Sequence, residues 1–256
     1  MRTRTHARTL IASGGAVVAA LVLSGCGGAD TDDAPVEHKS FAFSGRTLTI
    51  ETANTTLELV PADVKKVEVT RQVDGWVVLG SGPDPRWDMD GGTLSLKVKC
   101  KALISNCAAK QQVKVPRGVA VTVHGDNGKI VASGFDTALD LRSDNGEVTV
   151  RDTSGPLKLN SDNGGIVAEG ISGPTVRADS DNGAVRLGFT AVPTLVDTTS
   201  DNGRVVIELP PGSTSYAVTT SADNGNTSVE VPRSGNSSHV VKARSDNGEV
   251  KVRTAN

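Results

Sequence analysis

Hydrophobic and polar residues alternate with a period of two along the second half of this chain, in short runs around a recurring Asp-Asn-Gly tripeptide. In one run, Leu139 and Leu141 precede the tripeptide that begins at Asp144, and Val148 and Val150 follow it. Alternation with this period is typical of a β-strand with one buried face. The pattern therefore predicts two short strands that meet at a tight bend, each with one face turned inward.

The tripeptide occurs seven times, and successive copies are 18, 18, 19, 20, 22 and 23 residues apart. A nearly fixed period of this length indicates a repeat architecture with one structural unit per copy. The seven copies are Asp126-Asn127-Gly128, Asp144-Asn145-Gly146, Asp162-Asn163-Gly164, Asp181-Asn182-Gly183, Asp201-Asn202-Gly203, Asp223-Asn224-Gly225 and Asp246-Asn247-Gly248.

Two β architectures are compatible with these repeats. Asn-Gly between alternating runs is typical of a hairpin, so a meander of hairpins is one alternative. A meander gives no reason for the same face pattern to recur in an unchanged register, whereas in a solenoid each strand pairs in parallel with its equivalent one coil on. We therefore predict an all-β, single-stranded parallel β-solenoid (β-helix-like) of about eight coils, with an N-terminal β-rich capping elaboration.

Each residue type at the bend has an expected task. The Ser before most of the tripeptides, such as Ser161, can bond to neighbouring backbone. The seven Asn side chains are expected to stack about 4.8 Å apart as an amide ladder. The Gly after each Asn is expected to supply the positive φ of a sharp corner. Aromatic residues make up only 3% of the chain, which predicts a narrow interior with Phe135 and Phe189 in one corner.

A degenerate coil precedes the regular array. It has Leu48 and Ile50 before Asn54, and Leu57 and Leu59 after it, in the same register. The solenoid domain is therefore expected to span residues 46–256. Within it, residues 60–120 are interpreted as a capping insertion and residues 121–253 as the regular coils. The insertion contains three predicted strands, Val67–Val73, Leu94–Val98 and Val113–Val115, with Trp76 and Trp87 between them.

Residues 1–26 have the features of a targeting segment. Three Arg, at positions 2, 4 and 8, precede the apolar run Leu10–Leu23, which is too short to span a bilayer comfortably. The run ends in Leu23-Ser24-Gly25-Cys26, which matches a bacterial lipobox and predicts a diacylglyceryl group on the Cys26 sulfur. An ordinary secretory peptide is the alternative. Residues 27–45 are expected to form a flexible tether, so the protein would be anchored by lipid on the outer face of the cytoplasmic membrane.

Charge and cysteine content narrow the function classes. Without the targeting segment, 24 Lys and Arg remain against 29 Asp and Glu, a net charge of −5. A mildly acidic chain without a basic stripe does not favour nucleic-acid binding. Cys100 and Cys107 remain after Cys26 is assigned, and an even count in an exported chain predicts a disulfide. A metal site is the alternative, but the nearest histidine, His124, has no His or Cys companion in the sequence.

The Asp of each tripeptide could have a structural role or could bind a cation. Carboxylates about 5 Å apart would repel by about 0.8 kcal/mol per pair in bulk water, and Ca²⁺ would relieve this. The candidate calcium row is Asp126, Asp144, Asp162, Asp181 and Asp201. However, an Asp in a turn commonly caps its own backbone, and the glycine-rich motif of calcium-binding β-rolls is missing. We therefore expect a structural role for the row and no cofactor.

Catalysis and binding remain to be compared. A polysaccharide-active β-helix enzyme would use acidic and basic residues on a lateral face, and the outward candidates are Asp140, Asp179, Asp197, Arg142, Arg177 and Arg186. No nucleophile-elbow, zinc-protease or phosphate-loop motif is present in the sequence. A solenoid face suits an extended partner, so we expect a binding module. The last strand, Val250–Arg253, is expected to leave an open edge for self-association, guarded by Lys251 and Arg253.

With these motifs identified, the chain resembles the bacterial putative-adhesin family (domain of unknown function 4097). The resemblance covers roughly Thr47–Val252 and depends on the Ser-Asp-Asn-Gly-x-Val-x-Val repeats. The Lys-Cys-x₆-Cys insertion and the Val-Pro-Arg-Gly-Val run resemble its actinobacterial lipoprotein members. The resemblance implies a surface β-solenoid with an adhesin-like or envelope-scaffolding role, bound to an envelope protein or glycan, and it carries over no catalytic residue.

Overall fold

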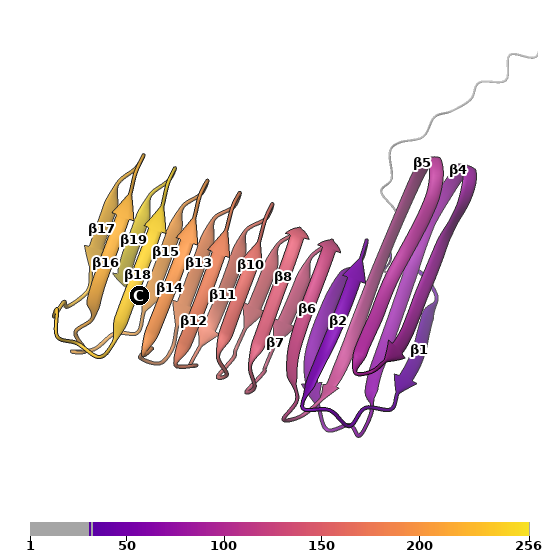
Figure 1. Ribbon diagram of the computed structural model, residues 1–256, viewed down its shortest axis with the longest axis horizontal. Coiled ribbons are helices and arrows are strands. Elements are labelled where there is room, and N and C mark those ends of the chain that lie inside the picture. Colours follow the sequence, from indigo (N-terminus) through magenta and orange to yellow (C-terminus); the bar gives the residue numbers. More distant parts are fainter. Residues whose placement is uncertain (1–30, 32, 256) are drawn as a thin grey trace, which may run out of the picture.

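The computed structural model describes residue 31 and residues 33–255. The regular secondary structure of these residues consists of β-strands alone. The strands form a stack of coils along one axis (Figure 1). Each coil contributes one strand to a first layer, before the bend, and one to a second layer, after it. The first layer consists of β2 Thr47–Ala53, β6 Ala120–Asn127, β8 Leu139–Asn145, β10 Leu157–Ser161, β12 Thr175–Ser180, β14 Leu195–Ser200, β16 Ala217–Ala222 and β18 Val240–Ser245. The second consists of β3 Thr56–Ala62, β7 Ile130–Ser133, β9 Val148–Arg151, β11 Ile166–Ile171, β13 Val185–Phe189, β15 Val205–Leu209, β17 Thr227–Glu230 and β19 Val250–Thr254.

Equivalent strands of neighbouring coils pair in parallel. Leu139 of β8 lies opposite Leu157 of β10, which lies opposite Val176 of β12. The register is unchanged between these coils, so the same inward and outward positions recur. The predicted parallel solenoid is confirmed, and the hairpin alternative is wrong for the regular coils.

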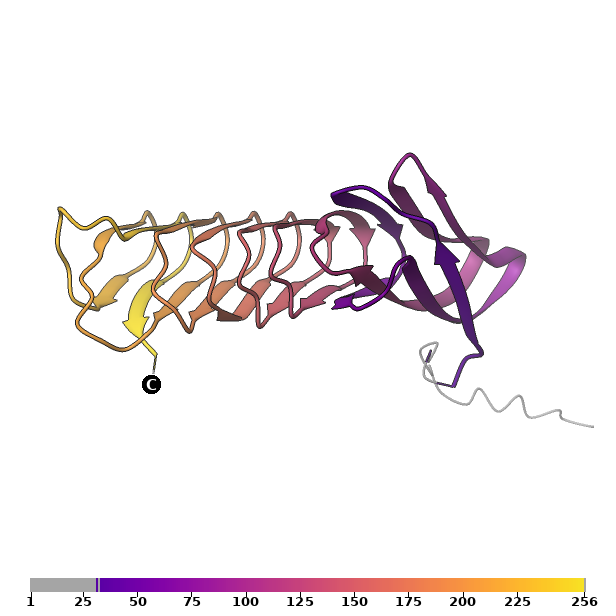
Figure 2. The ribbon, with the colours of Figure 1, turned by 90° about the horizontal axis from the view of Figure 1, so that it is seen from below.

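The inward side chains of the coils form one continuous core cluster. It lies between the two strand layers, which Figure 2 shows from below. Leu141 and Val150 of one coil are fully buried, as are their equivalents in the next coils. Burial of each such side chain contributes about 1.5–3 kcal/mol, so a coil is stabilised mainly by its neighbours. Phe135, two residues after the end of β7, and Phe189, the last residue of β13, are both buried.

Two sets of side-chain hydrogen bonds connect the bends of successive coils. The amide of Asn182 donates to Asn163 Oδ1 at 3.1 Å, and Asn202 donates to Asn182 Oδ1 at 3.0 Å. The hydroxyl of Ser200 donates to the carbonyl of Gly183 at 2.8 Å. These bonds confirm the predicted amide ladder and the bonding of the Ser to neighbouring backbone.

Glycine occupies each bend for a different physical reason from the one expected. Among the seven, only Gly128 has a positive φ, of 120°, so the general expectation of positive φ was wrong. Close approach of the coils is the cause instead. A Cβ at Gly183 would lie 2.2 Å from the carbonyl oxygen of Gly164, and one at Gly203 would lie 2.2 Å from that of Gly183. The glycines therefore stack directly on one another, and no side chain fits between them.

The last two coils are stacked out of sequence order. Strand β18 pairs with β14 on one side and β16 on the other, and β19 lies in the same way between β15 and β17. The expectation of an open edge at Val250–Arg253 was therefore wrong. Lys251 and Arg253 form ion pairs with Glu230, at 3.2 Å, and with Glu208. The outer edge at this end is formed by β16 and β17.

Side-chain composition accounts for this order. The inner coil places Val241, Val250 and Val252 in the core, where they are fully buried. The outer coil has Ala222 before its tripeptide, where most coils have a Ser that donates to the glycine carbonyl of the coil beneath. The coil of β18 and β19, with the more apolar interior and the Ser245 hydroxyl, therefore lies inside the stack. The coil of β16 and β17, with Ala222 at the equivalent position, lies at its end.

The N-terminal end is covered by a long two-stranded ribbon. Strands β4 Val67–Asp90 and β5 Thr93–Pro116 pair antiparallel, and β1 Val36–Phe41 pairs antiparallel with β4. The first part of β5 pairs with β2 and its last part with β3, so β5 follows the bend of the adjacent coil. Trp76 and Trp87 lie within β4 and not between separate strands.

Strand β1 also corrects the predicted tether. Residues 36–41 of the range 27–45 are hydrogen-bonded to β4, because Val36 lies opposite Gln72 and Phe41 opposite Val67. This part of the predicted tether therefore belongs to the folded domain. The predicted targeting segment, residues 1–26, and its lipidation site Cys26 lie outside the described residues.

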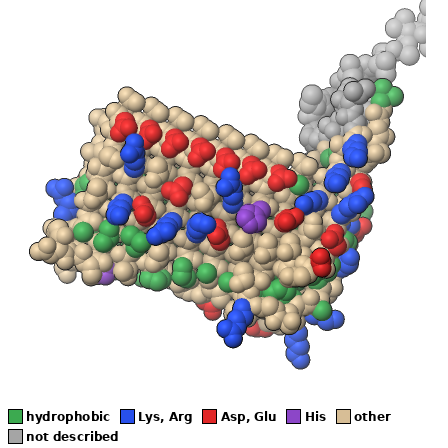
Figure 3. Space-filling view, in the orientation of Figure 1, with side chains coloured by type: hydrophobic (Ala, Val, Ile, Leu, Met, Phe, Trp, Pro, Cys, Tyr) green, Lys and Arg blue, Asp and Glu red, His purple; other side chains and the backbone are tan. Residues whose placement is uncertain are grey.

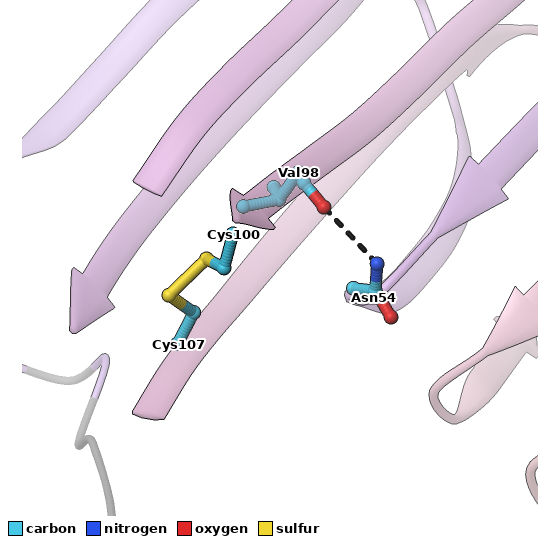
Figure 4. The surroundings of a disulfide bond; sticks show 4 residues. All are labelled: Asn54, Val98, Cys100 and Cys107. Carbon is cyan, nitrogen blue, oxygen red and sulfur yellow. Dashed lines mark hydrogen bonds between the residues drawn. A yellow bond between two sulfur atoms is a disulfide. The ribbon is translucent and has the colours of Figure 1, made fainter. Parts of the chain in front are cut away.

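The predicted disulfide joins Cys100 and Cys107 across the folded-back part of β5 (Figure 4). Their Cα atoms are 6.7 Å apart. Beside the bridge, Asn54 Nδ2 donates to the carbonyl oxygen of Val98 at 3.1 Å, which attaches this part of β5 to the bend of the adjacent coil.

Candidate functional site

The outward residues of the first layer form one broad charged surface (Figure 3). Because equivalent strands keep their register, outward positions of successive coils lie side by side. We call this surface the charged face and define it by its central residues, which come from β8, β10, β12, β14 and β18. They are Asp140, Arg142, Lys158, Arg177, Asp179, Asp197, Lys242 and Arg244.

Ion pairs connect some of these side chains across coils. Lys158 Nζ lies 3.0 Å from Asp140 Oδ2, and Arg142 Nη2 lies 3.1 Å from Asp162 Oδ2. Arg177 makes no direct ion pair with a described residue. All four paired side chains are at least one-third exposed, so each pair contributes little to stability. The charges are therefore available to a partner.

Asp179 has the most unusual electrostatic environment on the charged face. Partial burial raises the pKa of its carboxyl above the usual value, and the nearby Asp197 raises it further, whereas Arg177 opposes the shift. A carboxyl with a raised pKa beside a second carboxyl is a feature that glycoside-cleaving sites also use. The remaining candidates do not complete such a site, because Arg186 belongs to β13 and lies on the second layer.

The Asp of each tripeptide lies along the edge of the charged face, where Figure 3 shows a row of acidic side chains. Within residues 33–255, no group of three or more His, Cys, Asp or Glu side chains is arranged to hold a metal ion. Arginines lie between the carboxylates instead. Arg244 pairs with Asp223 at 3.1 Å and with Asp246 at 2.9 Å. No such group of three forms among the described residues at the candidate calcium row Asp126, Asp144, Asp162, Asp181 and Asp201.

The structure does not bring the three described histidines together. His38 Nδ1 lies 3.2 Å from Thr70 Oγ1 at the N-terminal end, and His239 Nδ1 lies 2.8 Å from the carbonyl oxygen of Pro193. His124 lies on β6, level with Arg142 on the neighbouring strand. No pair of histidines is therefore positioned for shared acid–base or metal chemistry.

The sequence reasoning missed one feature outside the charged face. Trp76 and Leu79 are exposed on the projecting part of the ribbon, with 50% and 80% of their surface accessible. A signal was present, because Trp76-Val77-Val78-Leu79 is an apolar run without alternation. An apolar run that cannot place alternate residues in a core indicates a contact surface.

A family comparison agrees with this architecture. The sequence model described as Toastrack DUF4097 matches residues 89–255, which is more than half of the chain. The chain belongs to the Toastrack family. A comparison with curated proteins finds no match.

A solved structure shows the same fold as this Toastrack chain, and a second one is similar to it. A "putative adhesin" from Bacteroides fragilis has 12% sequence identity and a TM-score of 0.50, with 85% of this chain and 97% of that chain covered. A "putative adhesin" from Parabacteroides distasonis has 12% identity and a TM-score of 0.44, with 86% and 98% covered. None of the described residues belongs to a helix that could cross a bilayer.

Proposed function

We propose that this protein is a lipid-anchored, extracytoplasmic binding module with an adhesin-like or scaffolding role in the cell envelope. One observation supports this most: strands in unchanged register give the charged face a continuous row of outward side chains. Eight first-layer strands at about 4.8 Å spacing make a face about 34 Å long. A surface of this length, with charges of both signs and weakly held ion pairs, suits an extended envelope protein or glycan.

The lipid anchor is proposed from the sequence. Cys26 would carry the lipid and keep the protein on the outer face of the cytoplasmic membrane. Mass spectrometry of the mature N-terminus tests this directly, because lipidation adds a diacylglyceryl group to the Cys26 sulfur. A mature protein that begins elsewhere, or that has an unmodified Cys26, contradicts the anchor.

Crosslinking and affinity capture from intact cells test the binding role. We expect a reproducible partner with the native protein and a weaker capture with Cys26→Ala, because the variant lacks the lipid that holds the protein at the membrane. We also expect Arg177→Glu to weaken the capture, because Arg177 is exposed on the charged face.

The matched control is Arg186→Glu. This arginine is also exposed and follows Arg177 within the same coil, but it lies on the second layer. Equal loss of the partner with both variants would place the binding surface outside the charged face. An empty capture from an abundant, correctly anchored protein would contradict stable binding and favour the enzyme alternative. In that alternative Asp179→Asn would abolish glycan cleavage, because the variant lacks the carboxyl that could donate a proton.

A further inference from the structure

The ribbon of β4 and β5 projects beyond the bends of the solenoid (Figure 1). Two hydrogen bonds mark where β5 leaves the stack and returns to it: Asn54 Nδ2 to the carbonyl oxygen of Val98, and Thr55 Oγ1 to that of Ala109, both at 3.1 Å. Ten residues of β5 lie between Val98 and Ala109, so about five run outward from the bends and five run back. At about 3.4 Å per residue, the ribbon extends roughly 17 Å past the bends.

The far end of this ribbon differs in composition from the rest of the surface. Residues 75–83 and 100–107 include one lysine, Lys101, and no acidic residue. Trp76 and Leu79 are exposed there, and Lys101 is exposed without an ion pair to a described residue. The acidic residues that border this range are Asp74, which directly precedes Gly75, and Asp84, which pairs with Arg86 at 3.2 Å. We call Trp76, Leu79 and Lys101 the ribbon tip.

The start of the described chain lies beside β4. Strand β1 begins at Val36, opposite Gln72, and the chain just before it makes a turn in which the Ala34 N–H donates to the carbonyl oxygen of Thr31 at 3.2 Å. Gln72 Nε2 donates to the carbonyl oxygen of Thr31 at 2.9 Å, which fixes the start of the described chain beside β4. Gln72 itself lies opposite Lys110, at the base of the projecting part. The described chain therefore starts near the base of the ribbon.

The length of chain before Thr31 limits the distance to the membrane. Five peptide units separate Cys26 from Thr31, and an extended chain covers at most about 3.6 Å per residue, or about 18 Å in all. This length is close to the roughly 17 Å projection of the ribbon. A lipid on Cys26 would therefore hold the bilayer surface close to the base of the ribbon. The distance from the base to the bilayer would be about the same as the distance from the base to the ribbon tip.

We propose that the ribbon tip is a membrane-contact site that inserts Trp76 and Leu79 into the headgroup region of an anionic bilayer, with Lys101 against the lipid phosphates. Tryptophan prefers this interface because it combines a large apolar ring with an N–H donor. Lysine is attracted to the negative surface potential of anionic lipid. Together the lipid and the tip make two attachment points, which fix the orientation of the solenoid. The proposal rests on the proposed anchor for its geometry.

Quenching of tryptophan fluorescence by brominated lipid tests the contact. The lipidated protein is placed in vesicles of phosphatidylcholine with about one-third phosphatidylglycerol. The chain has two tryptophans, so Trp87→Phe leaves Trp76, and Trp76→Phe leaves Trp87. Trp87 stacks against Arg71, whose guanidinium carbon lies 3.8 Å from the ring centre, in the N-terminal cap. We expect strong quenching of Trp76 and little of Trp87. Equal quenching of the two would overturn the proposal.

Co-sedimentation of Cys26→Ala protein with the same vesicles separates the tip from the anchor, because no lipid is attached. We expect Trp76→Ser with Leu79→Ser to weaken vesicle binding roughly tenfold, since each side chain buries apolar surface. The matched control Val192→Ser, at a residue 38% exposed, is expected to have no effect. Lys101→Gln should weaken binding only to anionic vesicles, whereas Lys242→Gln should not.

Three results would contradict the contact. Vesicle binding that is unchanged by the double substitution refutes the tip even if Cys26 is lipidated. A loss of equal size with Val192→Ser shows nonspecific adsorption. A change in the sedimentation mass of the protein without vesicles on substitution of Trp76 and Leu79 assigns the tip to a contact between copies of this chain. Failure of the anchor alone would appear as an unmodified Cys26, with vesicle binding by the tip retained.

Discussion

Replacement of Gly183 with alanine would place a methyl group where the adjacent coil already lies. The added Cβ would be 2.2 Å from the carbonyl oxygen of Gly164 and 2.5 Å from its carbonyl carbon. Both atoms are backbone, so no side chain can rotate away. The two coils must separate locally, which strains the hydrogen bond from Asn182 to Asn163, at 3.1 Å, and that from Ser200 to Gly183, at 2.8 Å.

The expected cost has two parts. Overpacking of a closely packed site costs about 1–3 kcal/mol. Each disrupted hydrogen bond adds about 0.5–1.5 kcal/mol. The sum is roughly 2–6 kcal/mol for Gly183→Ala, and urea unfolding followed by far-ultraviolet circular dichroism measures it. Hydrogen exchange should show faster exchange in β12–β15 than in β8 and β9, because a solenoid coil contacts only its neighbours.

Gly188→Ala is the matched control in the same coil. A Cβ at Gly188 would meet no atom closer than 3.9 Å, so we expect a change in unfolding free energy of less than about 1 kcal/mol. Gly183→Asn separates steric crowding from backbone conformation, because asparagine tolerates positive φ but has a Cβ. We expect Asn to be as destabilising as Ala. The steric explanation is refuted if Gly183→Ala and Gly188→Ala have the same stability.

The remaining predictions use the same unfolding assay. Ser200→Ala should lose about 1 kcal/mol, because its hydroxyl donates to a glycine carbonyl, whereas Ser143→Ala should lose almost nothing, because the buried Ser143 hydroxyl has no partner among the described residues. Substitution of Cys100 and Cys107 by Ala should cost about 2.5 kcal/mol by the loop-entropy relation and should increase exchange in the ribbon but not in the regular coils. Asp179→Asn should stabilise slightly, by less than about 0.5 kcal/mol, at neutral pH. Its raised pKa means that the folded state binds the proton more tightly, so the advantage of Asn should disappear as the pH falls through that pKa.

Each of these has a result that would contradict it. Equal losses for Ser143→Ala and Ser200→Ala would show that packing of the hydroxyl, and not its hydrogen bond, stabilises the bend. An unchanged stability of the cysteine double variant would mean that the bridge does not constrain the unfolded chain. A constant difference between Asp179→Asn and the parent protein across the acidic range would show that Asp179 does not titrate with a raised pKa.

The local pattern of the chain was enough to predict the strands, bends and parallel stacking. Alternation identifies inward residues such as Leu141 and Val150 because the side-chain period of a strand is fixed by its backbone. Repetition at each bend then determines the register, so the amide ladder that includes Asn163 and Asn182 could be predicted as well. The Cys100–Cys107 disulfide followed from the even number of cysteines that remain once Cys26 is assigned to the lipobox.

Other features depend on which surfaces meet in space, and the tertiary structure alone decided them. The order of the last two coils in the sequence does not predict that β18 lies between β14 and β16. The stacking order depends on which of the two coils packs better against the coil of β14 and β15. Likewise a glycine in a sequence does not distinguish positive φ from crowding, and only the position of Gly164 against Gly183 does. The ribbon tip required the fold most of all, because the exposure of Trp76 depends on how far β4 and β5 project beyond the coil that they cover.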